Sequence, residues 1–233
     1  MNNNLQPFPW PSPPDAVKCK AIRFNIQDLL AQSQGVALPA TLSKAVPKRR
    51  AEFLAGRLCA KEALRNLWDE EFDIPIATDR SPVWPAGTIG SISHTSDIAV
   101  AMVASDREYW GLGVDCEAVL DRKEASELAH MILAPEEPAA APARLSLAQF
   151  ITLAFSAKEA LYKAVYKVFG PTIGFHDATI LAIGQNQLTL CLTALSPAGK
   201  ASTYPIDVKY KFEENHVLTW LTIDHDHPVA APL

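Results

Sequence analysis

Apolar side chains recur with a helical period in two long segments of the chain. In residues 44–68 they form a stripe at a spacing of roughly 3.6 residues, made of Phe53, Leu54, Leu58, Leu64 and Leu67. In residues 147–169 a second stripe comprises Phe150, Leu153, Ala157, Leu161, Ala164 and Val168. Gly170-Pro171 ends this second pattern, because neither residue favours the continuation of a helix. Two long helices are therefore predicted, one in each half of the chain.

Shorter apolar and alternating runs predict strands around these helices. Residues 89–103 indicate two short strands on either side of Ser93-His94-Thr95, and residues 109–119 indicate a buried strand. Four further strand-like runs follow the second helix, at 178–183, 187–194, 204–212 and 216–223. Residues 134–145, rich in Ala and Pro, are expected to form a loop before the second helix.

Each half thus has one long helix and several strands, without the strict strand–helix alternation of a doubly wound sheet. The predicted fold class is α+β, with an N-terminal lobe at residues 17–108 and a C-terminal lobe at residues 109–233. Residues 1–16 contain the run Pro-Trp-Pro-Ser-Pro-Pro and are expected to form an extended arm, because proline is excluded from helix interiors and central strands.

The composition of the chain mainly excludes certain classes of function. With 233 residues and 48% hydrophobic composition, the chain can bury a large core. Its formal charge of -5 argues against a general binder of nucleic acid or of anionic membranes, because an excess of Lys and Arg captures such partners. An anionic ligand would therefore need a local basic pocket.

Cysteine usage and the lack of long apolar runs favour a reducing cytoplasm as the location. The four cysteines are scattered, with neither a CxxC pair nor a short-spaced His partner, so the sequence indicates neither a zinc site nor a disulfide framework. The first residues lack the cationic start and apolar run of a signal peptide. No later run reaches the roughly 18 apolar residues that a membrane span requires.

One predicted strand ends in two carboxylates, in the segment Gly113-Val114-Asp115-Cys116-Glu117. The strand period places Asp115 and Glu117 on the same side, where their negative charges repel. A hard divalent cation, which prefers oxygen ligands, would remove this repulsion. The alternative interpretation is a solvated strand end without a ligand.

The second predicted helix carries Glu159 and Lys163 one turn apart on the same face. Ala160 and Ala164 beside them are small enough to let another group approach closely. The charged pair is either part of a site or a surface ion pair that stabilises the helix by only a few tenths of a kcal/mol.

Basic and polar residues of the N-terminal lobe are open to two interpretations. Arg49, Arg50 and Arg57 form either an anion-binding group or a solvated helix face, and His94 is either functional or a satisfied structural histidine. The triplet His225-Asp226-His227 looks metal-like, but its place in a Pro-rich tail favours no function. The chain contains no GxxxxGK[ST], GxGxxG, GxSxG or HExxH motif.

Four segments occur together and in order, which weakens the non-functional interpretations: KRRAEFLAGRLCA, RSPVWPAGTIGSISHT, GVDCE and FSAKEALYKA. The set resembles the phosphopantetheinyl transferases, specifically the single-chain enterobactin-type branch, over about residues 45–170. The resemblance implies two similar α/β lobes with coenzyme A in a cleft between them. It also implies a cytoplasmic enzyme that moves the 4'-phosphopantetheine arm of coenzyme A to a serine of an acyl or peptidyl carrier protein, releases 3',5'-ADP and uses Mg²⁺.

The resemblance also implies roles for individual residues. The Mg²⁺ ligands would be Asp115, Glu117 and Glu159, and the catalytic residues Asp115, Glu159 and Lys163, with Glu159 as general base and Lys163 on the pyrophosphate. The coenzyme A site would be formed by Arg49, Arg57, Arg80, Ser93, His94, Thr95 and Lys163. Two positions depart from the pattern: Cys116 stands where some relatives have an acidic residue, and Phe155 where many have Trp.

The carrier protein would need a docking surface of its own. Carrier proteins are generally acidic, so we expect a basic and apolar patch that involves the loop at 118–145, with Arg122 and Lys123. The protein is expected to act as a monomer. Two other functions stay open: a module that binds coenzyme A or another nucleotide without catalysis, and a magnesium-dependent transferase that acts on a small alcohol.

Overall fold

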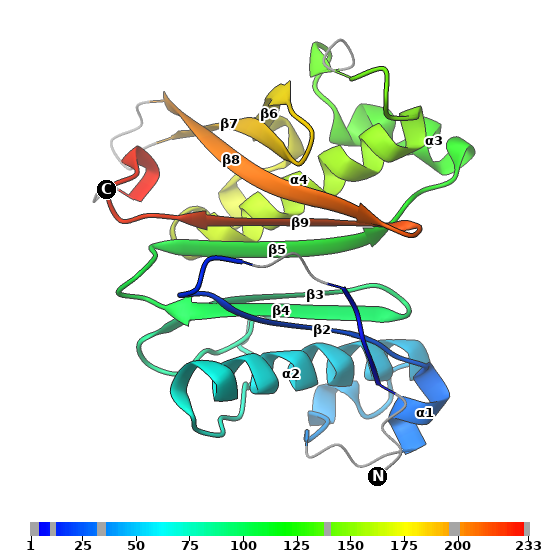
Figure 1. The fold of residues 1–233 in the computed structure, drawn as a ribbon, viewed down its shortest axis with the longest axis vertical. Coiled ribbons are helices and arrows are strands. Elements are labelled where there is room, and N and C mark those ends of the chain that lie inside the picture. Colours follow the sequence, from blue (N-terminus) through cyan, green and yellow to red (C-terminus); the bar gives the residue numbers. More distant parts are fainter. Residues whose placement is uncertain (1–4, 10–12, 32–35, 138–140, 196–200, 231–233) are drawn as a thin grey trace. The chain divides into compact units, whose positions relative to one another are not determined.

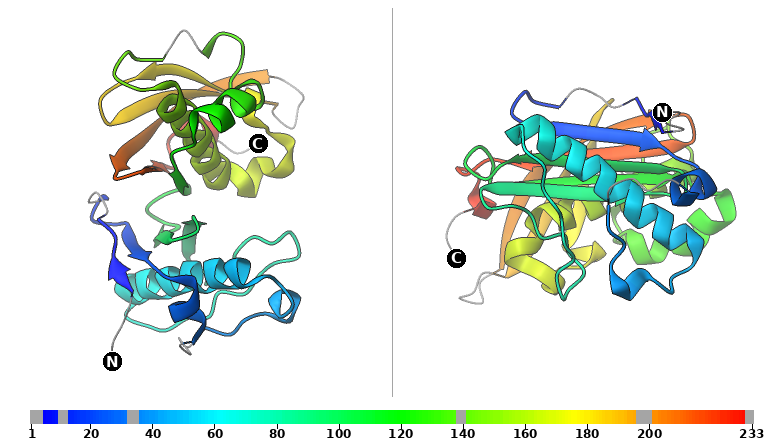
Figure 2. Two further views of the ribbon diagram at one scale, coloured as in Figure 1. Left: turned by 90° about the vertical axis from the view of Figure 1, so that its right-hand side faces the viewer. Right: turned by 90° about the horizontal axis from the view of Figure 1, so that it is seen from below.

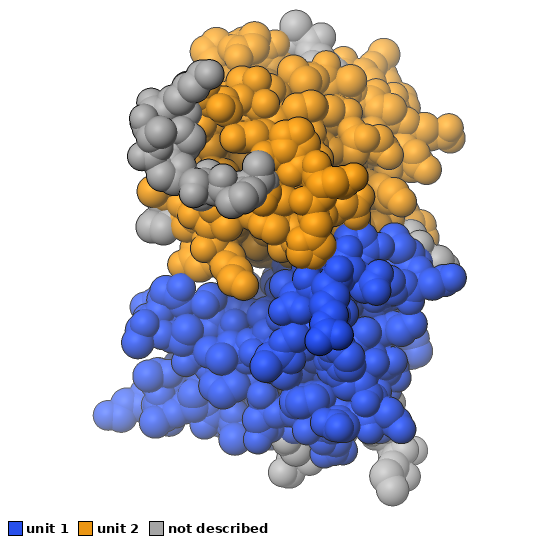
Figure 3. Space-filling model, turned by 90° about the vertical axis from the view of Figure 1, so that its left-hand side faces the viewer, with its two compact units in different colours: residues 1–109 blue, residues 110–233 orange. Residues whose placement is uncertain are grey.

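The chain folds into two compact units, Met1–Tyr109 and Trp110–Leu233, which Figure 3 distinguishes by colour. This computed structural model describes residues 5–9, 13–31, 36–137, 141–195 and 201–230. Each unit combines an antiparallel sheet with helices, and the α+β class expected from the sequence is confirmed. No helix in these described ranges has the length and apolar character needed to cross a membrane.

The first unit is a four-stranded sheet with one long helix against it (Figure 1). Its elements are β1 (Gln6–Pro7), β2 (Lys18–Arg23), α1 (Ile26–Ala31), a 3-10 turn (Ala40–Leu42), α2 (Pro47–Trp68), β3 (Thr88–His94) and β4 (Ile98–Ser105). The strands follow the order β1-β2-β4-β3. Figure 2 shows α2 running along one face of this sheet, where it packs on β4 and β2. Its core includes Leu64 of α2 with Ala99 and Val103 of β4.

Several sequence predictions for this unit are confirmed, and two elements were missed. The predicted helix at 44–68 begins at Pro47, a residue suited to the first helical turn because its missing N–H would have no partner there. The two strands on either side of the Ser-His-Thr segment are present as β3 and β4. The strand β2 and the short helix α1 were not predicted. Within the expected arm, Gln6–Pro7 pairs with β2 and Phe8 is buried, whereas residues 1–4 and 10–12 lie outside the described residues.

The second unit is a five-stranded sheet in the order β5-β9-β8-β7-β6. Its elements are β5 (Gly111–Ala118), α3 (Arg122–Ile132), α4 (Leu147–Phe169), 3-10 turns (Gly170–Thr172 and Phe175–Asp177), β6 (Ala178–Ile183), β7 (Gln187–Leu195), β8 (Ala201–Glu213), β9 (His216–Ile223) and a last 3-10 turn (Pro228–Ala230). The helix α4 packs chiefly on β5 and β9, and α3 packs on α4 (Figure 1). All five strands predicted for this part of the chain are present.

The two helices of this unit begin at capping boxes. In a capping box, the first residue's side chain accepts from the backbone N–H three residues on, and the side chain of that later residue accepts from the backbone N–H of the first. Ser146 and Gln149 form the box of α4, which ends at Gly170 as predicted. Asp121 and Glu124 form the box of α3. The segment 118–145 is therefore not a continuous loop as expected, because α3 occupies residues 122–132 of it.

Candidate active site

Strand β5 and helix α4 approach each other closely because β5 has glycine where they meet. A Cβ added at Gly113 would lie 1.9 Å from the carbonyl oxygen of Ala160, and one at Gly111 would lie 2.8 Å from that of Ala164. The small residues of α4 were expected to let another group approach, and that group is the β5 backbone. The close contact brings the face of α4 that carries Glu159 and Lys163 to the acidic end of β5.

Lys163 forms an ion pair with the first carboxylate of β5. Its Nζ donates to Asp115 Oδ1 at 2.6 Å and to the carbonyl oxygen of Val114 at 3.3 Å. The Asp115 residue is 1% exposed, and it pairs with Thr219 of β9 in the sheet register. Lys163 was predicted to lie one turn from Glu159 and to contact a pyrophosphate; its contacts here are with β5.

The protonation of Glu117 and Glu159 depends on their burial and on neighbouring charges. Burial, followed by the negative charge of Asp115, raises the pKa of Glu117 to about 8, and Glu159 adds to this effect while Lys163 opposes it. Burial also raises the pKa of Glu159, with a further contribution from Asp115 and an opposing one from Lys163. Added positive charge nearby would therefore favour the ionised forms of Glu117 and Glu159.

The donor chemistry of this group fits a magnesium ion, although the group is not assembled for one. Carboxylate oxygens are the hard ligands that Mg²⁺ prefers. Among the described residues, no group of three Asp, Glu, His or Cys side chains is spaced to hold an ion, and Asp115 faces Lys163 instead. Cys116 is fully buried, and the alternation of side chains along β5 places it on the opposite face from its acidic neighbours.

A cavity of about 330 Å³ lies beside Glu159 within the second unit, a feature that the sequence did not predict. Its lining is mostly apolar and comes from α4, the segment 173–175 at the start of the second 3-10 turn, and strands β6 and β7. The lining residues are Lys158, Glu159, Leu161, Tyr162, Ile173, Gly174, Phe175, Ala178 and Leu192. Phe155, which departs from the family pattern, packs against Phe175 with ring centroids 5.4 Å apart.

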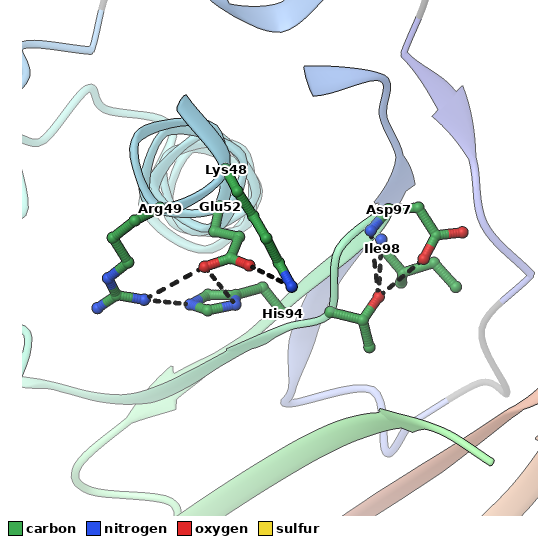
Figure 4. Close-up of polar contacts among 7 residues, drawn as sticks. Lys48, Arg49, Glu52, His94, Asp97 and Ile98 are labelled. Atoms are coloured by element: carbon green, nitrogen blue, oxygen red, sulfur yellow. Dashed lines mark hydrogen bonds and ion pairs between the residues drawn. The ribbon is translucent and has the colours of Figure 1, made fainter. Parts of the chain in front are cut away.

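In the first unit, Arg49 and His94 meet at a buried glutamate (Figure 4). Arg49 Nη1 lies 3.0 Å from His94 Nε2, and because a guanidinium only donates, Nε2 is the acceptor. The neutral imidazole then carries its proton on Nδ1, which lies 3.9 Å from Glu52 Oε2. Glu52 also pairs with Arg49 at 3.6 Å and with Lys48 at 3.9 Å. Glu52 was missed in the sequence, although it lies one turn after Arg49 on the same helix.

Arg57 is held in the interior of the first unit. Its Nε donates to the carbonyl oxygen of Ile74 at 2.9 Å, and its guanidinium lies 4.8 Å from the centroid of the Phe53 ring. Burial, followed by the positive charge of Arg49, lowers the pKa of Arg57 to about 10. The positive charges of Arg49 and Arg57 therefore affect each other, while Glu52 offsets part of the charge of Arg49.

The other predicted residues of the first unit have separate surroundings. Thr95 closes the β3–β4 turn: its Oγ1 donates to Asp97 Oδ1 at 3.0 Å and accepts from the backbone N–H of Ile98 at 3.0 Å. Ser93 is 6% exposed on β3. Arg80 is exposed at a positive φ of 71°, and no side-chain contact joins it to Arg49 or His94 in the described part of the chain.

Comparison with known proteins gives matches over both units. The model of the 4'-phosphopantetheinyl transferase N-terminal domain matches residues 38–104, and that of the 4'-phosphopantetheinyl transferase superfamily matches residues 111–221. Enterobactin synthase component D of Salmonella typhimurium is 34% identical over 201 residues, which cover 82% of this chain and 81% of that protein. The same component of Escherichia coli O157:H7 is 37% identical over 152 residues (65% and 70%). The 4'-phosphopantetheinyl transferase Npt of Nocardia iowensis is 31% identical over 139 residues (60% and 62%).

Proposed function

Because the chain belongs to the 4'-phosphopantetheinyl transferase superfamily and is an enzyme of that class, we propose that it acts through Asp115, Glu117, Glu159 and Lys163. Its reaction moves the 4'-phosphopantetheine arm of coenzyme A to a serine of an acyl or peptidyl carrier protein. The observation that carries the proposal is that burial and the negative charge of Asp115 raise the pKa values of Glu117 and Glu159, with Lys163 paired to Asp115 beside them. Such crowding suits a site that receives a cation together with a pyrophosphate.

The transfer forms one bond and breaks one. The carrier serine Oγ bonds to the phosphorus that bears the pantetheine arm, and the bond from that phosphorus to the bridging oxygen of the pyrophosphate breaks, so that 3',5'-ADP leaves. Glu159 accepts the serine proton, a role typically worth about 10² to 10⁴ in rate. Burial raises the pKa of Glu159, and a higher pKa makes a carboxylate a stronger base, which supports this assignment. Lys163 stabilises the negative charge of the departing 3',5'-ADP.

Asp115, Glu117 and Glu159 would hold the magnesium ion. When bound, the ion would neutralise the negative charge of the pyrophosphate, an effect worth several kcal/mol. Lys163 pairs with Asp115 in this structure, so it would have to release that carboxylate to the ion and turn to the pyrophosphate, the contact proposed for it.

The basic residues of the first unit would bind the phosphorylated adenosine end of coenzyme A. A chain with a formal charge of -5 must concentrate positive charge locally to bind a 3'-phosphate. Arg49 and Arg57 suit this role because a guanidinium can donate two parallel hydrogen bonds to a phosphate. The other proposed members of this group are Arg80, Ser93, His94 and Thr95.

The cavity beside Glu159 would receive the pantetheine arm. That arm carries two methyl groups and short aliphatic segments between its amides, so a mostly apolar lining suits it. Because Glu159 lines the same cavity, an arm bound there would place its phosphorus near the proposed base.

The start of α3 would contribute to carrier docking. Arg122 and Lys123 are exposed in its first turn, and Met131 near its end is 57% exposed. These side chains offer the basic and apolar contacts that an acidic carrier protein needs. The family resemblance suggests carriers of siderophore, nonribosomal peptide or polyketide assembly lines as the first candidates, and the name of the Salmonella relative, enterobactin synthase component D, supports the siderophore assembly line among them.

Mass spectrometry of apo-carriers incubated with the protein, coenzyme A and Mg²⁺ tests this function. The expected result is a mass increase of one phosphopantetheine group on at least one carrier, with no increase on the same carrier when its acceptor serine is replaced by alanine. A protein that binds coenzyme A but modifies no carrier would be a binding module instead. Consumption of coenzyme A in the presence of a small alcohol alone would support the third candidate function.

A further inference from the structure

A buried ion pair lies next to the proposed catalytic base, Glu159. Lys158 Nζ lies 2.7 Å from Glu137 Oε2, and the two side chains are 1% and 0% exposed. Buried charges are stable only when the geometry is good and their remaining hydrogen-bonding capacity is used. The contacts of this pair therefore indicate what it holds in place.

The pair uses its hydrogen bonds to join three parts of the second unit. Glu137 Oε2 accepts from the backbone N–H of Ala134 at 2.5 Å, and Oε1 accepts from that of Ile180 at 2.7 Å. Lys158 Nζ also donates to the carbonyl oxygen of Ile132 at 2.7 Å. The end of α3, the middle of α4 and the strand β6 are thus connected through one carboxylate and one ammonium group.

These connected segments form two walls of the cavity beside Glu159. Lys158 lines the cavity from α4 and immediately precedes Glu159. Ala178 lines it from β6, two residues before Ile180. A change in the ion pair would therefore alter the separation of the walls and the position of the turn of α4 that carries the base.

We propose that Glu137 is a positioning residue for the pantetheine arm: it holds Lys158 and β6 so that the cavity keeps the width that the arm requires. The proposal rests on the proposed function, because it takes coenzyme A as the ligand. Glu137 itself lies behind the cavity wall and is not among the residues that line it. Its effect on coenzyme A is exerted through Lys158 and through the backbone of β6.

A purely structural role predicts a different result from a positioning role. A structural residue affects the binding of every ligand through the fraction of folded protein. A residue that sets the cavity width affects coenzyme A, which has the pantetheine arm, and not 3',5'-ADP, which lacks it. The ratio of the two dissociation constants therefore separates these roles.

The experiment is titration calorimetry of the full chain with coenzyme A and with 3',5'-ADP, both in the presence of Mg²⁺. For Glu137→Gln, the dissociation constant of coenzyme A should rise about tenfold or more, since removing one partner of a buried ion pair leaves an uncompensated charge in the cavity wall. That of 3',5'-ADP should change less than about twofold. Glu213→Gln, which removes the carboxylate from an ion pair with Lys211 on β8, is the matched control and should change neither constant.

The double variant Glu137→Met with Lys158→Met covers the case in which the single variant does not fold. Replacing a buried ion pair with apolar residues of similar volume often preserves stability. The backbone groups of Ala134, Ile132 and Ile180 lose their partners in this variant, so it should show the same selective loss of coenzyme A affinity. Equal weakening of both ligands, or no change for either, would overturn the positioning role. A wild-type protein that binds neither ligand would overturn the proposed function, and the inference with it.

Discussion

Replacing Gly113 with alanine is the sharpest test of how the site is built. The new Cβ would lie 1.9 Å from the carbonyl oxygen of Ala160, whereas ordinary van der Waals contact begins at 3.4 Å. The difference between these two distances is 1.5 Å, which β5 and α4 have to supply by moving apart. The obstructing atom belongs to the helix backbone, so no side-chain rotation can relieve the contact.

The Gly113→Ala variant should lose both stability and catalytic rate. Extra volume in a packed interior typically costs about 1–3 kcal/mol, and a backbone obstruction places this variant at the upper end of that range or above it. The separation also moves Asp115 away from Glu159 and Lys163, and a misplacement on the order of 1 Å costs about 10²-fold in rate. Urea denaturation measures the free energy of unfolding, and a carrier-modification assay measures the rate.

Two other glycines serve as comparisons. Gly111→Ala places its Cβ 2.8 Å from the carbonyl oxygen of Ala164, so it should destabilise the protein less than Gly113→Ala. At Gly174 the nearest atom is 3.9 Å away and the φ of −126° suits any residue, so its alanine variant should have near wild-type stability. A Gly113→Ala protein with wild-type stability and turnover, or one more stable than Gly111→Ala, would refute the close contact.

Three further predictions concern charge. Glu159→Gln should abolish carrier modification while circular dichroism and the urea midpoint stay near wild type; retained turnover would remove Glu159 from the role of base. In metal-free protein, the folded-state pKa of Glu117 is about 8, above its unfolded value near 4.5. The folded state therefore holds a proton on Glu117 that the unfolded state has lost, so the free energy of unfolding should fall as the pH rises from about 4.5 to 8. Glu117→Gln should weaken this dependence of stability on pH. Urea midpoints measured in the presence of a chelator would contradict the prediction if they rose with pH. Arg122→Glu with Lys123→Glu should raise the KM for the carrier protein and leave that for coenzyme A unchanged; equal effects on both constants would count against α3 as the docking surface.

The sequence predicted elements well where the local pattern was strong and missed them where it was weak. Helix α4 has both a long apolar stripe and two end signals, and its predicted bounds are the observed ones. Helix α3 buries only Ala125 and Ile132, so its sequence shows no clear helical period of apolar residues. Its Asp121–Glu124 capping box was nevertheless a usable signal. Strand β2 alternates basic residues with Cys19 and Ala21, a pattern that is easily taken for an exposed segment.

The charged contacts of the interior could not be predicted in the same way. Glu137 and Lys158 are 21 residues apart, and neither lies in a motif that names its partner. Only the packing of α3 and β6 against α4 brings them together. Glu52 illustrates the same limit: it is one of many glutamates on helix surfaces until β3 places His94 beside it. A sequence pattern indicates which charges share an element, and the fold decides which of them meet.

Helix α4 explains why neighbouring residues of one short motif have such different environments. Successive residues are about 100° apart around a helix, so each position in Lys158-Glu159-Ala160 faces a different neighbour. Lys158 points to the end of α3 and to Glu137, where its charge is fully buried. Ala160 faces the β5 backbone at Gly113, and one turn on Lys163 reaches Asp115. Glu159 therefore lies between Lys158, which forms the buried ion pair with Glu137, and Ala160, which packs against β5. The proposed base is thus positioned by contacts that its neighbours make, and for this reason the proposed chemistry depends on Glu137 and Gly113 as well as on the carboxylates.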